Sequence, residues 1–309
     1  MKVGLVLPNI GRSASRNNVL AVARGAEDAG IDSLWAIDRL LWPVRPQVPY
    51  PASPDGSLPE EYLHVLDPIG TLLFVAGNTK KISLGTSIAV IPNYSPALFA
   101  RLITTLDVLS EGRSIVGLGL GWLKDEFDAS GIPFKDRGAR ADEFIQVLKK
   151  IWSQEVTEFN GKYYNIPASK IGLKPVQKPH PPVLLGGFTP KAFARIVKHA
   201  DGWIPIAGFG PLSQTGQAIE ALREEARKAD RDPSEIRIFM LTYPNILDSP
   251  PPEGSRMPMT GTIDQIGSDI VQIKSMHVDT IMLGHVFSPV GSDANKTIEV
   301  TKQLARFAR

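Results

Sequence analysis

Short apolar runs alternate with longer amphipathic segments along the whole chain. The runs that predict strands begin near Val3, Ser33, Ile82, Ser114, Val183, Trp203, Ile236 and Thr280. Continuous apolar runs are typical of parallel strands, because helices cover the sheet and no strand face meets water. Strands that each lead into a helix, repeated eight times, predict a closed (β/α)8 TIM barrel, for which about 250 residues is typical. We therefore expect residues 1–309 to form a single α/β domain.

The segments between the strands carry apolar residues at helical spacing. One such stripe ends at Ala29, and Gly30 follows where a helix C-cap belongs. Thr262 and Gln265 have the spacing of a capping box before another stripe. A further helix is expected to bury the leucines at positions 98, 102, 106 and 109.

The chain is longer than a minimal barrel, and the excess lies in a few stretches. Residues 40–62 are rich in proline and predict a long loop after the second strand, and residues 124–137 predict a charged, solvated loop after the fourth. Residues 155–175 contain an Asn-Gly turn and predict a hairpin. Residues 244–258 predict a mobile segment after the seventh strand. Insertions after strands two, four and seven fall on the C-terminal face, where barrel enzymes build their active sites.

Composition narrows the class of protein. The 34 basic and 32 acidic residues leave a net charge of +2, which argues against a nucleic-acid partner. The chain has no cysteine, which excludes disulfides and thiolate chemistry, and its five histidines lack metal-ligand spacing, so we expect no metal. No apolar run is long enough to span a membrane, and residues 1–8 predict a buried strand rather than a signal peptide. We expect a cytoplasmic protein.

Three glycines mark the end of the fourth predicted strand. Gly117, Gly119 and Gly121 share one strand face, because side chains alternate with a period of two. Such a bare face admits the close approach of a flat ligand. The alternative is that small residues simply fit a crowded barrel interior.

A second glycine motif follows the fifth predicted strand. Gly186 and Gly187 lead into Phe188, Thr189 and Pro190, where Thr189 suits a helix N-cap and proline suits the first helical position. Free N–H groups at a helix start bind anions such as phosphate. An ordinary strand-to-helix turn explains the spacing equally well, and the loop after His285 is a rival phosphate site.

Polar side chains end strands two and three. Asp38 follows the second strand beside Arg39, and a carboxylate at this rim can exchange protons or accept hydrogen bonds from a ring. The alternative is an ion pair that closes a loop. Ser83, Thr86 and Ser87 give the third strand more hydroxyls than a buried strand requires, and they either meet a polar ligand or bond to the backbone.

Nearly the whole chain resembles the bacterial luciferase-like monooxygenase superfamily, in particular the branch that uses the deazaflavin coenzyme F420. The stretches that carry the resemblance are residues 84–96, 105–113, 117–122, 131–134, 137–143, 174–182, 186–187 and 200–203. The resemblance implies a barrel that holds a flavin or deazaflavin in its C-terminal mouth. It also implies that the enzyme transfers a hydride at the deazaflavin ring.

The resemblance assigns roles to particular positions. It places Asp38 against the ring, a non-proline cis peptide at Ser87-Ile88 behind it, and the phosphate on the motif that begins at Gly186, in preference to the loop after His285. The cofactor-binding residues that it implies are Asp38, Thr86, Ser87, Ile88, Gly119, Gly121, Gly186, Gly187, Phe188 and Thr189.

Two positions depart from the sugar-phosphate-oxidising relatives. Arg39 stands where those relatives have a histidine, and Trp122 stands where they have an acid. The departures disfavour glucose 6-phosphate and predict a site with one cation and one flat apolar wall. With Asp38, Arg39 and Trp122 as catalytic residues, we expect an apolar or aromatic carbonyl, alcohol or enone substrate, with or without a carboxylate.

Two other functions fit the same barrel. One is a two-component monooxygenase that uses reduced FMN and oxygen and depends on a partner reductase. The other is a barrel that binds a flavin without catalysis. By analogy with the family we also expect a homodimer, to which the helix over residues 98–109 contributes.

Overall fold

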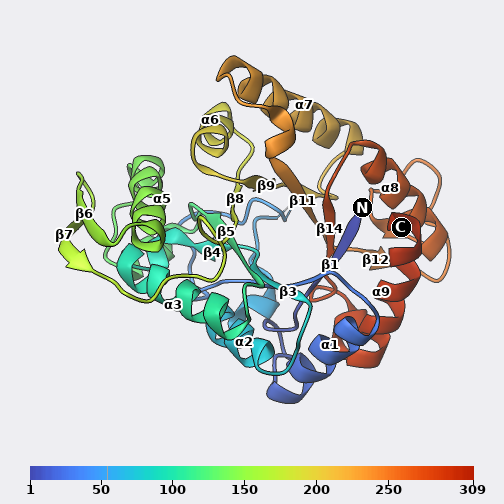
Figure 1. The fold of residues 1–309 in the computed structure, drawn as a ribbon. Coiled ribbons are helices and arrows are strands. Elements are labelled where there is room, and N and C mark those ends of the chain that lie inside the picture. The colour runs from blue at the N-terminus through green and yellow to red at the C-terminus, as the bar shows by residue number, and fades with distance from the viewer. Residues whose placement is uncertain (54) are drawn as a thin grey trace.

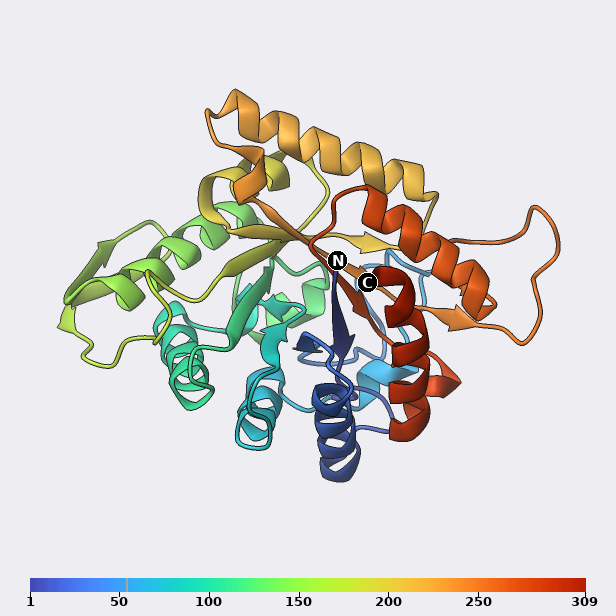
Figure 2. The same ribbon diagram turned by 45° about the vertical axis from the view of Figure 1, so that its right-hand side comes forward.

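The computed structural model describes residues 1–53 and 55–309, and its centre is a closed ring of parallel strands (Figures 1 and 2). In order round the ring, the strands are β1 (Lys2–Val6), β2 (Ser33–Ala36), β3 (Ser83–Thr86), β5 (Ser114–Gly119), β8 (Val183–Gly186), β9 (Gly202–Ile204), β11 (Arg237–Thr242) and β14 (Thr280–Leu283). Pairing of β9 with β11 and of β14 with β1 closes the ring. The (β/α)8 barrel and its eight strand positions are confirmed.

Helices form the outer layer of the barrel (Figure 1). They are α1 (Arg16–Asp28), α2 (Pro68–Ala76), α3 (Pro96–Leu109), α5 (Arg137–Ser153), α6 (Pro190–His199), α7 (Leu212–Lys228), α8 (Ile263–Ser275) and α9 (Ala294–Ala308). The first strand and the last helix lie side by side, since the amino group of Met1 donates to the carbonyl of Ala308 at 3.3 Å. Gly30 has the positive φ of +69° that a left-handed cap requires. Among the described residues, no helix combines the length and hydropathy that a membrane crossing requires.

The predicted buried face of α3 is wrong at two of its four positions, whereas Leu102 packs against the core as expected. Leu106 is buried, but Leu98 and Leu109 are 42% and 63% exposed. The helix instead buries Phe99 and Ile103 against the barrel. Positions 99, 103 and 106 also have helical spacing, so the sequence offers two overlapping apolar stripes and the bulkier aromatic side chain lies in the core.

The insertions agree with prediction except in one place. Residues 155–175 contain the expected antiparallel hairpin, β6 (Val156–Asn160) with β7 (Asn165–Lys170). The proline-rich stretch ends in a 3-10 turn at Glu60–Leu63. The charged loop predicted for residues 124–137 instead begins with a helix, α4 (Lys124–Ala129), in which Glu126 and Phe127 are buried. The solvated loop predicted there is therefore wrong in its first half.

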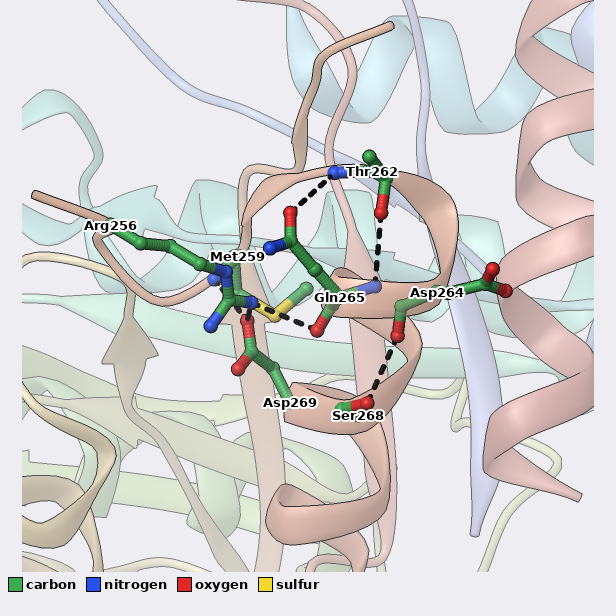
Figure 3. A network of polar contacts seen from close by, with 7 residues as sticks. All are labelled: Arg256, Met259, Thr262, Asp264, Gln265, Ser268 and Asp269. Carbon is green, nitrogen blue, oxygen red and sulfur yellow. Dashed lines mark hydrogen bonds and ion pairs between the residues drawn. The ribbon is translucent and has the colours of Figure 1, made fainter. Parts of the chain in front are cut away.

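The segment after β11 is tied to α8 by the polar contacts in Figure 3. Asp269 of α8 accepts hydrogen bonds from the guanidinium of Arg256 and, at 2.7 Å, from the backbone of Met259. Thr262 and Gln265 form the predicted capping box. These contacts fix the end of the segment that includes β12 (Asn245–Ile246) and β13 (Thr260–Gly261). The mobility expected of residues 244–258 stays a prediction.

The interior of the barrel is filled by side chains. Trp35 is fully buried, packs edge-on against Phe239 at 5.5 Å between ring centroids, and donates to Ser33 Oγ at 2.9 Å. Gly4 and Gly85 make room for this ring, because a Cβ on either would lie 2.5 Å or less from its atoms. The plug of side chains around Trp35 forms the floor beneath the C-terminal mouth.

Candidate active site

A cavity of about 470 Å³ opens at the C-terminal ends of the strands. Nine of the predicted site residues line it, namely Asp38, Arg39, Ser87, Ile88, Gly121, Trp122, Gly186, Gly187 and Phe188. Thr86, Gly119 and Thr189 do not. Side chains absent from the sequence prediction complete the walls, among them Tyr50, Tyr62, Ile204, Ile206, Phe209, Leu241 and Tyr243.

Asp38 is held in place by one backbone N–H and by the side-chain amides of two asparagines. Its Oδ2 accepts from Val90 N at 2.8 Å and from the amide of Asn93 at 3.4 Å. The preceding residue, Ile37, exchanges hydrogen bonds with the side chain of Asn9, which is fully buried after β1. Asn9 therefore fixes the chain that carries Asp38 into the cavity, and no sequence motif distinguished it.

The environment of Asp38 disfavours its charge. Burial raises the pKa of Asp38 to about 6 and outweighs the hydrogen bond from Val90, which lowers it. The carboxylate of Glu126 also raises this pKa, and the guanidinium of Arg39 lowers it. A carboxyl group with such a pKa can accept and release a proton near neutral pH.

Arg39 lies at one end of the cavity in a fixed position. Its Nε is 3.4 Å from Glu126 Oε1, with the side chain of Arg39 only 7% exposed and that of Glu126 fully buried. Glu126 also accepts from Leu40 N at 2.8 Å. The Arg39 guanidinium stacks over the rings of Trp122 at 5.3 Å and Tyr62 at 5.4 Å. Arg39 is therefore paired, but with a residue of α4 that the sequence prediction placed in a solvated loop.

Aromatic rings extend this end of the cavity. Tyr50, from the proline-rich stretch, packs against Trp122 at 5.3 Å and against Tyr62 at 6.1 Å. Tyr62 packs in turn on Phe287, which contacts Tyr243. The proline-rich stretch was predicted as a loop beside the site, and its tyrosines were the signal that it forms a wall.

The glycine face of β5 packs against protein. The Ser87–Ile88 bond is cis, as the resemblance implied, and the Ile88 side chain occupies the space above Gly119, where a Cβ would lie 1.8 Å from Ile88 Cδ1. A Cβ on Gly117 would lie 2.0 Å from the carbonyl oxygen of Thr86. The crowded-interior alternative therefore accounts for these two glycines, and contact of Gly119 with a cofactor stays a prediction.

The side-chain hydroxyls of Thr86 and Ser87, at the end of β3, differ in their hydrogen bonds. Thr86 Oγ1 donates to Gly117 O at 2.7 Å and accepts from Gly117 N at 3.0 Å, so it joins β3 to β5. Ser87 Oγ lies buried at the cavity wall without a hydrogen-bond partner among the described residues, as does Arg39 Nη1. Unsatisfied buried polar groups are costly, and a ligand oxygen or ring nitrogen in the cavity relieves that cost.

The motif after β8 has the geometry of an anion site. Thr189 caps α6 by accepting from Ala192 N at 3.1 Å, and Pro190 is the first helical residue. Gly187 has φ +126°, and its carbonyl accepts from Trp203 Nε1 at 2.8 Å. The first N–H groups of a helix have no intrahelical acceptor and carry the positive end of its dipole. This turn and the cavity beside it fit a cofactor with a flat ring and a phosphate.

The rival position, the loop after β14, does not open into this cavity but lines a separate one of about 350 Å³ beside Arg12 and Glu60. His285 is buried, and its Nε2 lies 3.1 Å from Thr301 Oγ1 of α9. Burial lowers its pKa to about 4. His285 does not line the cavity. Within residues 1–53 and 55–309, no cluster of three or more histidine, aspartate or glutamate side chains is placed to hold a metal ion.

The turn at the start of α6 and the cavity at the C-terminal ends of the strands together offer a place for a phosphate-bearing cofactor. The chain belongs to the luciferase-like monooxygenase family, whose model matches residues 1–250. Members of this family are F420- or flavin-dependent oxidoreductases and monooxygenases, so the protein is an oxidoreductase that uses a deazaflavin or a flavin.

Comparisons with individual proteins agree with this family. An uncharacterised protein of Mycobacterium tuberculosis is 36% identical over 206 residues, which cover 66% of this chain and 72% of that protein. An F420-dependent glucose-6-phosphate dehydrogenase of Amycolatopsis mediterranei is 29% identical over 215 residues, 68% of this chain and 60% of that enzyme.

Two solved structures share the fold. An F420-dependent secondary alcohol dehydrogenase in complex with an F420-acetone adduct superposes with a TM-score of 0.79, at 20% identity and over 100% of this chain and 99% of that one. A monooxygenase of Streptomyces bottropensis superposes with a TM-score of 0.77, at 20% identity and over 99% of this chain and 98% of that one.

Proposed function

We propose that the protein is an F420-dependent oxidoreductase that moves a hydride between the deazaflavin and a carbon of an apolar or aromatic alcohol, carbonyl compound or enone. The observation that carries the proposal is a single cavity that joins the turn at Gly186 to the aromatic wall around Arg39. The relative from Amycolatopsis supports F420 over FMN, since that enzyme is an F420-dependent dehydrogenase.

The chain provides a place for each part of the cofactor. The turn from Gly186 to Thr189 and the start of α6 would hold the phosphate, and Ile88 would support the ring beside Asp38. When bound, the deazaflavin supplies a two-electron carrier that accepts or donates a hydride.

The residues at the other end act on the substrate. In alcohol oxidation Asp38 accepts the hydroxyl proton while the carbon gives up its hydride, and in carbonyl reduction Asp38 returns that proton. The Arg39 guanidinium donates a hydrogen bond to the substrate oxygen, and Trp122 and Tyr50 pack against the substrate body and exclude water. Arg39 and Trp122 replace the histidine and acid expected of a sugar-phosphate oxidiser, so we propose that glucose 6-phosphate is not the substrate.

An anaerobic assay tests this function. The protein is incubated with oxidised F420 and, separately, with 1-phenylethanol, cyclohexanol and glucose 6-phosphate, and bleaching of the cofactor is followed. We expect bleaching with an apolar alcohol, none with glucose 6-phosphate, and a large loss of rate in Asp38→Asn. Oxygen insertion into these compounds with reduced FMN and a reductase, without F420 bleaching, would instead establish the monooxygenase.

We also propose a homodimer. The outer face of α3 exposes Leu98 and Leu109, which a second copy of the chain would cover. Sedimentation of the protein at several concentrations tests this, and a monomer at all of them contradicts it.

A further inference from the structure

The charges around the cavity nearly cancel. Of the described residues that line it, only Asp38 and Arg39 are formally charged. Glu126 lies behind Arg39 at 3.4 Å and is fully buried, so the one cation is already paired. Arg39 and Asp38 therefore face a ligand at this end with the Glu126 carboxylate directly behind them, and with Glu126 ionised the three charges sum to zero or to a negative value.

The position of Arg39 leaves it little freedom to serve a second anion. Its guanidinium is confined between the rings of Trp122 and Tyr62, and its Nε faces Glu126. Nη1 carries two N–H groups and has no partner among the described residues, so the guanidinium can still donate to an oxygen in the cavity. A neutral oxygen needs only such a donor, whereas a carboxylate gains most from a cation that no other carboxylate already pairs, and Arg39 is paired with Glu126.

We propose that the cavity selects uncharged ligands, in which a carbonyl or hydroxyl oxygen is attached to a flat apolar body, and that it rejects carboxylates. Glu126 is the positioning residue that sets this preference, because it neutralises Arg39 and holds it against the rings. The inference rests on the proposed function in taking this cavity as the substrate site. It narrows the substrate class, since the sequence alone left a carboxylate open.

The excluded ligands are carboxylates, and like charge excludes them. A carboxylate that approached Arg39 would also approach Asp38 and Glu126, and like charges in a desolvated site repel strongly. Replacement of Glu126 by glutamine keeps an oxygen that can accept from Leu40 N and removes one negative charge. In that variant Arg39 has lost the carboxylate of Glu126, so the summed charge at this end of the cavity is one unit more positive and an anion is repelled less.

The isosteric pair benzamide and benzoate tests the proposal without cofactor or turnover. Dissociation constants are measured by ligand-observed NMR for the wild type, Glu126→Gln, the double variant Arg39→Gln/Glu126→Gln, and Glu158→Gln. Glu158 is exposed on the β6–β7 hairpin, so its substitution makes the same charge change outside the cavity. Loss of benzamide binding in Trp122→Ala confirms that the ligand occupies this site.

We expect wild type to bind benzamide about ten-fold or more tightly than benzoate. Glu126→Gln should raise the affinity for benzoate by about ten-fold and leave the affinity for benzamide nearly unchanged. The double variant should again prefer benzamide to benzoate. Glu158→Gln should leave the ratio as in wild type. Benzoate binding as tight as benzamide in wild type, no binding of benzamide, or an equal shift in Glu158→Gln would overturn the proposal.

The wild-type comparison decides the question even if Glu126→Gln fails to fold. Titration of the same wild-type preparation with F420 separates the two proposals. A protein that prefers benzamide but does not bind F420 contradicts the proposed function and leaves the selectivity intact. A protein that binds F420 but prefers benzoate contradicts the selectivity and leaves the proposed function intact.

Discussion

Arg39 and Glu126 form a buried ion pair that joins the end of β2 to the short helix α4 inserted after β5. Glu126 also accepts from Leu40 N, so one carboxylate fixes both the cation at the cavity and the start of the proline-rich stretch. The pair is therefore a structural link between two insertions as well as part of the site.

Truncation of Glu126 should destabilise the protein strongly. Glu126→Ala leaves Arg39 buried without its partner and Leu40 N without an acceptor, which we expect to cost about 3–5 kcal/mol of unfolding free energy. Urea unfolding measures the change. Asp128→Ala is the control on the same helix, because Asp128 is half exposed in its pair with Lys124 and should cost less than about 1 kcal/mol. Equal losses in the two variants would contradict the buried pair.

Asp38 should make stability depend on pH. Its pKa is about 6 in the folded protein against 3.8 for the free group, so the folded state keeps the proton longer than the unfolded state. The unfolding free energy should therefore fall as pH rises from about 4 to about 6, by roughly 3 kcal/mol, and then level off. Asp38→Asn should lack this component. Parallel pH profiles for the variant and wild type would show that Asp38 titrates normally.

Asp38 should also determine how kcat/KM depends on pH. If Asp38 accepts the proton in alcohol oxidation, kcat/KM rises with pH through about 6 and is flat above it, because only the carboxylate accepts. Asp38→Asn should lose most of the rate and the limb near pH 6. An unchanged limb in Asp38→Asn would assign the proton to another group.

Alanine substitutions at Gly117 and Gly119 of β5 should lower the unfolding free energy by different amounts, because an added Cβ meets backbone at one position and a side chain at the other. Gly117→Ala forces a Cβ onto the backbone of Thr86 and should cost about 3 kcal/mol or more. Gly119→Ala displaces only the tip of Ile88, so we expect about 1–2 kcal/mol, together with weaker cofactor binding as Ile88 moves into the cavity. Gly172→Ala is the control, since nothing lies within 4 Å of its added Cβ, and should stay within about 0.5 kcal/mol. Urea unfolding of the three variants checks this order, and Gly117→Ala as stable as Gly172→Ala would contradict it.

Much of the fold was predictable because its signals are local. The buried strands are continuous apolar runs, the β6–β7 hairpin contains an Asn-Gly turn, and the capping box at Thr262 depends on two residues three positions apart. Asp38 and Gly186 were predictable as residues of the cavity wall because both lie at or just after the C-terminal end of a strand, on the face where barrels bind ligands.

The remaining features depend on contacts between distant segments. Glu126 lies in the charged run Lys124–Glu126, and only its distant partner Arg39 explains why it is buried. Thr86 and Gly117 satisfy each other across two strands, which no single-strand pattern shows. The core side of α3 was ambiguous because both of its faces carry apolar side chains.

The measurement that tests the central claim most directly is a fluorescence titration of cofactor-free protein with F420 and, separately, with FMN. We predict tight binding of F420 and weak binding of FMN, with F420 binding reduced in Gly187→Val, since that side chain would crowd Ala192 at the start of α6. Tight FMN binding with weak F420 binding would contradict the account and make the protein a flavin monooxygenase. Binding of neither cofactor would remove the basis for the roles of Asp38, Gly186 and Gly187.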